Sequence, residues 1–232
     1  MEQWSVKQES PASRLQSLGG RENVNPFFLL VARTYDPGQI VDGANDNLTG
    51  CYMGISVLRE MERLGVVPEN TEIGVILIGS EEAGLKGAKA WAETHRNDYS
   101  DVPTYILCFD TIHNPKHLMV NRRDLNGTVR SDEAMAEAFL SAAAQEGVPC
   151  RSGKVPLMGG STDSAAFTQG GFRSVGITGL NHVLEDYYHT RKDTYDNLDD
   201  TGLENCYKAT VRFIYNMDQS VSYTDNKQLQ GE

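Results

Sequence analysis

Several features that mark other classes of protein are missing from this sequence of 232 residues. It has no apolar stretch long enough to cross a bilayer, so we expect no membrane partner. It has no internal repeat and no low-complexity segment, which argues against repeat architectures. No internal linker divides it, and its length suits a single domain with a large core.

Basic residues are scarce relative to acidic ones. Lysine and arginine together number 21 against 32 aspartates and glutamates, which gives a formal net charge of -11. A surface of this sign repels phosphate backbones, so it argues against a nucleic-acid partner. The same excess of acidic residues is consistent with a protein that binds cations.

The N-terminal segment lacks the apolar core of a secretory signal. The sequence as written therefore predicts a cytoplasmic protein, or a secreted one if the N-terminus is truncated. Residues 1–25 are polar and show little periodicity, which predicts a loose N-terminal arm. We expect one domain over residues 26–222 and a flexible tail over residues 223–232.

Cysteine is also sparse, with four residues widely separated along the chain: Cys51, Cys108, Cys150 and Cys206. They show no paired spacing of the kind that binds metals. Buried free thiols are the favoured interpretation, and a disulfide framework is the weaker one.

Apolar runs alternate along the chain with segments of helical periodicity. The runs predict strands at 26–32, 72–79, 103–110 and 173–179, the first three of them buried. Helices are predicted at 48–64, 84–95, from Ser131 onward, within 161–171 and at 203–214. Continuous apolar strands alternating with helices predict an α/β fold, in which helices cover both faces of a mostly parallel, mixed sheet.

Acidic residues follow several of the predicted strands. Glu81 and Glu82 come directly after one strand, and Asp110 ends the next. Asp46 lies at the entrance to a helix after the first strand and its loop, and His189 lies in the loop after the last clear strand. Ligands of open α/β sheets bind beyond the carboxyl ends of the strands, so we expect these side chains to meet at one edge.

Each of these residues, taken singly, has an ordinary structural explanation. Asp46 before a helix is typical of an N-cap, Asp110 is typical of a turn, and a lone His189 is typical of a surface. Their combination at one predicted edge favours a metal site.

Carboxylates and an imidazole without a thiolate suit zinc, with manganese or cobalt as alternatives. Adjacent Glu81 and Glu82 cannot both point the same way from an extended backbone. One of the pair can bind a metal while the other acts as a general base toward a metal-activated water.

Five segments carry a resemblance to a known family: GANDNLTG, GSEEAGLKGA, FDTI, STDSAAF and YYHTRKDTYDNL. They resemble the co-catalytic zinc exopeptidases of the aminopeptidase Y and bacterial leucyl aminopeptidase type, a group related to glutamate carboxypeptidase and glutaminyl cyclase. The resemblance runs from about Phe27 to the last predicted helix. It implies a three-layer sandwich, one or two zinc ions, and removal of N-terminal residues from peptide or aminoacyl substrates.

The resemblance also implies a role for each matching residue. Asp46 corresponds to the carboxylate that bridges two metals, and Glu82 and His189 to the remaining ligands of one of them. Asp110 corresponds to a ligand of the other metal. Glu81 corresponds to the general base, and a supporting role falls to Asp163.

The sequence departs from the family pattern before Asp46, where the family has a His-x-Asp motif. Asp36 occupies the aspartate position, where it would orient an imidazole, but Thr34 occupies the histidine position. A threonine hydroxyl is a poor zinc ligand. His113 is a candidate substitute, and an exposed loop histidine is the favoured interpretation of it.

Three functions remain open from the sequence. The first is an aminopeptidase whose activity is reduced, or dependent on added metal, because of Thr34. The second is a relative without catalytic activity that acts as a binding protein. The third is an acyltransferase of the glutaminyl cyclase type that uses a single zinc held by Asp46, Glu82 and His189.

Overall fold

The computed structural model describes residues 42–155, 160–180 and 187–229, with the backbone alone for 221–229. These residues belong to one unit, Ile40–Glu232. The expected arm over 1–25, the expected strand over 26–32, and both Thr34 and Asp36 lie outside the described residues.

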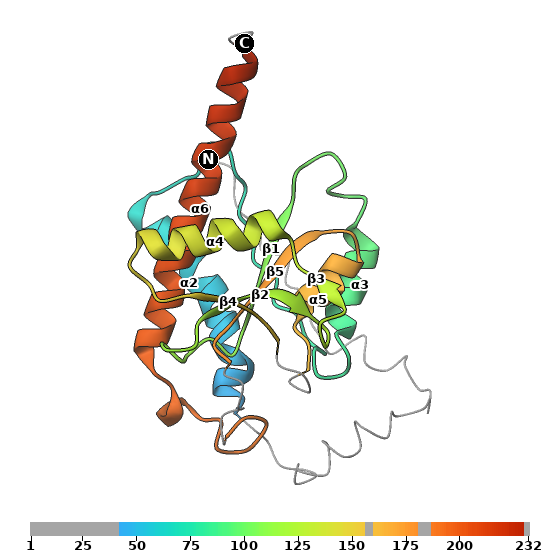
Figure 1. Ribbon diagram of the computed structural model, residues 1–232, viewed down its shortest axis with the longest axis vertical. Coiled ribbons are helices and arrows are strands. Elements are labelled where there is room, and N and C mark those ends of the chain that lie inside the picture. The colour runs from blue at the N-terminus through green and yellow to red at the C-terminus, as the bar shows by residue number, and fades with distance from the viewer. Residues whose placement is uncertain (1–41, 156–159, 181–186, 230–232) are drawn as a thin grey trace. The chain divides into compact units, whose positions relative to one another are not determined.

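A mixed five-stranded sheet forms the centre of this unit (Figure 1). Its strands are β1 (Tyr105–Asp110), β2 (Met119–Asp124), β3 (Val129–Arg130), β4 (Arg151–Lys154) and β5 (Arg173–Thr178). The order is β1-β5-β2-β3, and β4 pairs with β2. β1 runs parallel to β5, and β2 runs parallel to β4 but antiparallel to β3 and β5. The predicted α/β fold with a mixed sheet is confirmed.

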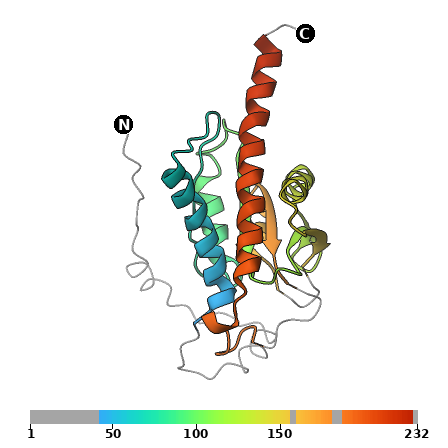
Figure 2. The same cartoon turned by 90° about the vertical axis from the view of Figure 1, so that its left-hand side faces the viewer.

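Helices cover both faces of the sheet. They are η2 (Ala44–Leu48), α2 (Thr49–Leu64), α3 (Lys86–His95), α4 (Glu133–Gln145), α5 (Asp163–Gln169), η3 (Tyr195–Asn197) and α6 (Asp200–Leu229). α2, α4 and α6 pack on one face, and Figure 2 shows α6 running beside α2. α3 and α5 pack on the other face. The result is the expected three-layer arrangement.

Side chains along β1 point alternately to the two helical layers that cover the sheet. Leu107 and Phe109 pack into the cluster that includes Phe139 of α4, whereas Ile106 and Cys108 pack into the cluster that includes Phe167 of α5. Successive side chains of a strand point to opposite faces, so a continuous apolar run serves both layers. All four cysteines are free thiols, but only Cys206 is buried, so the expectation of buried thiols holds for that residue alone.

The prediction of a buried strand over residues 72–79 is wrong. The segment is not assigned to any strand, and the side chains of Ile76 and Leu77 are 43% and 58% exposed. A strand needs a hydrogen-bonded neighbour, and among the described residues β1 pairs only with β5. Apolar content alone therefore overstated the burial of this segment.

The last helix is longer than predicted. α6 continues to Leu229 and so passes residue 222, where we expected the domain to end. Residues 223–229 contain neither glycine nor proline, and Gly231 follows shortly after, so nothing local interrupts the helix.

Within the described ranges, no helix combines the length and apolarity needed to span a bilayer.

Candidate metal centre

Three of the predicted site residues converge. The Nε2 atom of His189 lies 2.9 Å from Oδ2 of Asp46 and 3.0 Å from Oε1 of Glu82. One ligand atom from each residue lies within 4.8 Å of the others. Segments far apart in the sequence therefore deliver one imidazole and two carboxylates to a single point.

Asp46 is placed by a short irregular helix. It lies in η2, which follows Gly43 in a left-handed conformation (φ 62°) and leads into α2. The side chain of Asn47 donates to the carbonyl oxygen of Phe109 at 2.7 Å, and this bond ties the segment to β1. Asp46 is thereby held beside the carboxyl end of β1, where the sequence placed it.

Glu81 and Glu82 lie in a turn between the 72–79 segment and α3. The turn is closed by hydrogen bonds from the backbone N–H of Leu85 to the Glu81 carbonyl and from that of Lys86 to the Ser80 carbonyl. Ser80 and Leu85 both have positive φ, at 62° and 59°. The side chain of Glu82 is 59% exposed, so the third candidate ligand lies at the surface.

His189 lies in a turn that precedes η3. Its backbone has a positive φ of 57°, and its ring stacks on Tyr188 with centroids 3.9 Å apart. The backbone N–H of Thr190 donates to the carbonyl of Tyr187 at 2.9 Å and closes the turn. Stacking and turn closure together fix the direction in which the imidazole points.

The three groups shift one another's protonation in the metal-free chain. Burial raises the pKa of Asp46, although His189 opposes the shift. Burial also disfavours the charged form of Glu82, but its contact with His189 prevails and lowers its pKa. Burial by itself would lower the pKa of His189, but the two carboxylates outweigh it and raise the pKa to about 10.

The residues fit a zinc ion on chemical grounds. Ligands about 2.0–2.1 Å from a tetrahedral zinc lie roughly 3.3 Å from one another, and both contacts of His189 are close to that separation. An imidazole with two carboxylates is a donor set that zinc accepts, and it leaves a fourth position open. Asp46, Glu82 and His189 are the residues that would hold the ion.

Asp110 lies nearby but outside this set of three. It ends β1, and its Oδ1 atom is buried without a hydrogen-bond partner among the described residues. Burial holds the pKa of Asp110 well above its ordinary value, and the charges of Asp46 and Glu81 add to the shift. A buried carboxyl oxygen with no donor fits a ligand position that a second cation would fill.

Glu81 and Asp163 form the other acidic pair of the site. Burial, followed by repulsion from Glu82 and Asp163, raises the pKa of Glu81 to about 8. Asp163 is the first residue of α5, and burial together with Asp124 raises its pKa to about 6. Carboxyl groups with pKa values raised in this way mark candidates for proton transfer.

The interpretation of His113 as an exposed loop histidine is wrong. Its side chain is buried, at 6% exposure. Its Nδ1 atom accepts from the backbone N–H of Asp199 at 3.1 Å, and its Nε2 atom contacts the hydroxyl of Tyr187. Its two ring nitrogens therefore connect the segments that carry Tyr187 and Asp199.

Sequence reasoning missed the residues that hold the site together. Asn45, Asn47 and Asp193 are polar residues whose side chains bind backbone groups of neighbouring loops or, for Asn47, of β1. All three lie inside the motifs that carried the family resemblance, next to the candidate ligands. Their types are also ordinary in loops, so only that proximity could have identified them.

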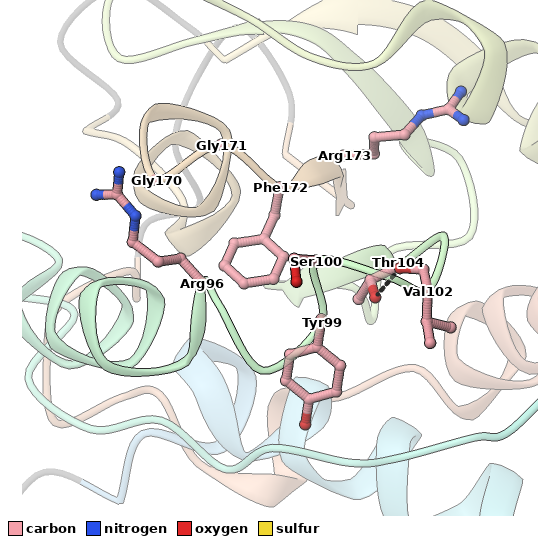
Figure 3. A pocket seen from close by; sticks show the side chains of 9 residues that line it. All are labelled: Arg96, Tyr99, Ser100, Val102, Thr104, Gly170, Gly171, Phe172 and Arg173. Carbon is pink, nitrogen blue, oxygen red and sulfur yellow. Dashed lines mark hydrogen bonds between the residues drawn. The ribbon is translucent and has the colours of Figure 1, made fainter.

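Two of the hollows among the described residues are lined by none of the three candidate ligands. One, of about 220 Å³, lies where β1 and β5 begin; in it Phe172 points inward while Arg96 and Arg173 point away (Figure 3). The guanidinium of Arg173 is engaged by Asp132 and Tyr105. The other, of about 350 Å³, is lined by residues that include His113 and Tyr187.

Comparisons with known proteins agree with the geometry. Aminopeptidase YwaD of Bacillus subtilis is 27% identical over 207 residues, which cover 82% of this chain and 41% of the relative. The structure of BSAP, a zinc aminopeptidase from Bacillus subtilis, matches with a TM-score of 0.65 at 21% identity and covers 79% of this chain and 44% of that chain. A glutaminyl cyclase from an Acidobacteriales bacterium matches with a TM-score of 0.56 at 19% identity and covers 77% of this chain and 63% of that chain.

The structural likenesses show the fold, and the chain spans less than half the length of the two Bacillus proteins. The evidence for the family comes from the sequence itself. The model of peptidase family M28 matches residues 19–214, which is most of the sequence, and the chain therefore belongs to that family.

Proposed function

We propose that this chain is a zinc-dependent exopeptidase that removes N-terminal residues from peptide substrates. The observation that carries the proposal is the convergence of Asp46, Glu82 and His189. Membership of family M28 supports hydrolysis of peptides. Similarity to an aminopeptidase and to a zinc aminopeptidase supports the N-terminal direction and the choice of metal.

Zinc at this position supplies a Lewis acid that polarises a carbonyl and makes water more acidic. Glu81 is the general base of the proposal, because it directly precedes the candidate ligand Glu82 and corresponds to the general base of the family that the sequence resembles. A carboxylate at this position can take a proton from the attacking water and return it to the leaving amine. Asp163 supports this role, because its charge raises the pKa of Glu81.

We further propose that the chain binds one zinc tightly and a second cation weakly. Asp46 and the buried Asp110 are the residues available to the second cation. With threonine at position 34, the imidazole that the family supplies there is missing. The expected result is a lower activity that increases when zinc, manganese or cobalt is added.

The test is hydrolysis of aminoacyl-p-nitroanilides by the full chain and by the Glu81→Gln variant. Loss of the base should lower kcat by about 100-fold or more while zinc content stays the same. Glu93→Gln, an exposed glutamate on α3, is the matched control and should keep the activity. Equal rates for the full chain and Glu81→Gln would contradict the proposed base.

A second candidate function is acyl transfer with a single zinc, as in glutaminyl cyclases. It is favoured by the finding that, among the described residues, only one group of three or more potential ligands lies close together. The test is to incubate the same preparation with a peptide that has an N-terminal glutamine and to measure the release of ammonia. Release of ammonia without cleavage of aminoacyl-anilides would favour this alternative over the exopeptidase.

A further inference from the structure

Asp193 connects the two loops that carry Asp46 and His189. Its Oδ1 atom accepts from the backbone N–H of Asn45 at 2.7 Å, and its Oδ2 atom accepts from the backbone N–H of Asp46 at 2.9 Å. Its carbonyl oxygen accepts from the backbone N–H of Ala44 at 3.2 Å. Three consecutive amides of the loop that holds Asp46 therefore donate to one residue.

The same residue is fixed to the turn that carries His189. The backbone N–H of Asp193 donates to the carbonyl of Thr190 at 3.1 Å. The hydroxyl and the backbone N–H of Thr190 donate to the carbonyl of Tyr187, at 2.7 and 2.9 Å. These hydrogen bonds connect Asp193 to the turn from Tyr187 to Thr190, in which His189 lies.

Asp193 is not itself a ligand of the site. Its side chain is 1% exposed, and both carboxylate oxygens are occupied by backbone amides. Hydrogen bonds from two amides to a buried carboxylate are charge-assisted and directional, so they hold the donors more firmly than neutral acceptors do. Such an acceptor controls the distance between the segments that it joins.

We propose that Asp193 is a positioning residue that sets the separation of Asp46 and His189 for a cation. This inference rests on the metal site of the proposed function. Without the Asp193 carboxylate, the loop that carries Asp46 loses two of its hydrogen bonds to the loop that carries His189. Part of the binding free energy of the ion would then be used to bring the two ligands together, and the affinity for the ion would fall. Partners that orient metal ligands in this way commonly change the affinity for the metal by about 10–100-fold.

A purely structural role for Asp193 would affect folding but not metal binding. The chain offers a matched control in Asp218 of α6, which is 6% exposed. The Asp218 carboxylate accepts from the backbone N–H groups of Glu69 and Asn70, at 3.1 and 2.8 Å. It therefore binds two consecutive backbone amides as Asp193 does, but it joins α6 to residues 69–70, well before the nearest candidate ligand, Glu82, in the sequence.

The experiment compares Asp193→Asn with Asp218→Asn in the full chain. In each variant an amide NH₂ replaces one acceptor oxygen and faces a backbone N–H. Both variants should lower the melting temperature of the EDTA-treated protein, by roughly 2–8 °C. Zinc affinity, measured by competition with a chromogenic chelator, should fall by about 10–100-fold in Asp193→Asn. It should stay within about twofold of the unsubstituted chain in Asp218→Asn.

Asp193→Glu is a second variant that keeps the charge and moves the carboxylate outward by one methylene. Its zinc affinity should also be lower than that of the unsubstituted chain. This variant replaces Asp193→Asn in the comparison if Asp193→Asn does not fold. Unchanged zinc affinity in a folded Asp193 variant, or an equal loss in Asp218→Asn, would overturn the role of Asp193 alone. If the unsubstituted chain binds no zinc, both this role and the proposed metal site are overturned.

Discussion

Asp46 and His189 lie far apart in the sequence, yet Oδ2 of Asp46 is 2.9 Å from Nε2 of His189. The contact brings together a carboxylate from η2 and an imidazole from the turn before η3. In the metal-free chain it stabilises a protonated imidazole. A metal ligand has to be deprotonated, so a cation and this proton compete for the same place.

Zinc binding is expected to release protons. The pKa of His189 in the metal-free chain is about 10, so the ring is charged near neutral pH and must lose its proton to bind a metal. Calorimetric titration at about pH 7.5, in two buffers of different ionisation enthalpy, should show release of about one proton or more per zinc. His189→Gln should bind zinc more weakly and release fewer protons, whereas His95→Gln, on the exposed surface of α3, should match the unsubstituted chain. A buffer-independent heat would contradict the assignment.

The metal-free protein is expected to lose stability as pH rises from about 4.5 to about 8. Glu81 has an ordinary pKa of 4.5 and a folded pKa of about 8, so within this window the folded chain binds a proton that the unfolded chain has released. Stability falls with pH wherever the folded state binds more protons. The raised pKa of His189 acts in the same direction, and its contribution is lost as pH rises from about 6.5 to about 10.

Urea unfolding of the EDTA-treated protein at about pH 5, 6.5 and 8 measures this slope. Glu81→Gln cannot titrate and should show a flatter dependence. Glu93→Gln should retain the slope of the unsubstituted chain. An identical slope for Glu81→Gln would show that the Glu81 carboxyl is not responsible.

Gly50 is expected to be essential for the approach of α2 to β1. A Cβ atom at this position would lie 2.4 Å from the carbonyl oxygen of Phe109 and 2.6 Å from Oδ1 of Asn47. Gly50→Ala should therefore destabilise the chain by about 1–3 kcal/mol, measured by urea unfolding.

Gly54, one turn further along the same helix, is the matched control. Its nearest contact would be Cγ1 of Val75 at 3.0 Å, a side-chain atom that can shift. Alanine favours a helix by about 1 kcal/mol over glycine, so Gly54→Ala should change stability by no more than about 1 kcal/mol. Equal losses in the two variants would contradict the close approach at Gly50.

The hydroxyl of Thr162 is expected to contribute to stability through Asp124. The two side chains are 2% and 0% exposed, and Oγ1 of Thr162 donates to Oδ2 of Asp124 at 2.6 Å. Thr162→Val should cost about 1.5–3 kcal/mol, because a hydrogen bond to a buried carboxylate is lost. Thr94→Val removes an exposed hydroxyl that donates to the Ala90 carbonyl, and it should stay within about 0.5 kcal/mol. Urea unfolding of the two variants tests the difference.

The parts of the fold that were predicted are those in which local pattern and packing agree. The apolar runs that form β1 and β5 lie beside each other in the sheet, and the periodic segments that form α2 and α3 are helical. β2 was missed because four of the six residues in its sequence, MVNRRD, are polar. Its burial comes from β4 and β5 on either side, which is tertiary information.

The candidate ligands were found because their motifs combine unusual residues at specific spacings. Two adjacent glutamates after an apolar run, and a histidine between a tyrosine and a threonine, stand out in a single sequence. Asp193 and Asn45 do not stand out, because aspartate and asparagine are ordinary loop residues. Their importance comes from the backbone amides that they meet, and only coordinates show which amides those are.

The three candidate ligands differ in exposure: 59% of the Glu82 side chain is in solvent, while the side chains of Asp46 and His189 are 12% and 19% exposed. A cation taken up by the proposed site would therefore reach Glu82 before it reaches the two recessed groups. Release would follow the reverse path, so the residence time of the metal would depend on how readily Glu82 turns back toward bulk water.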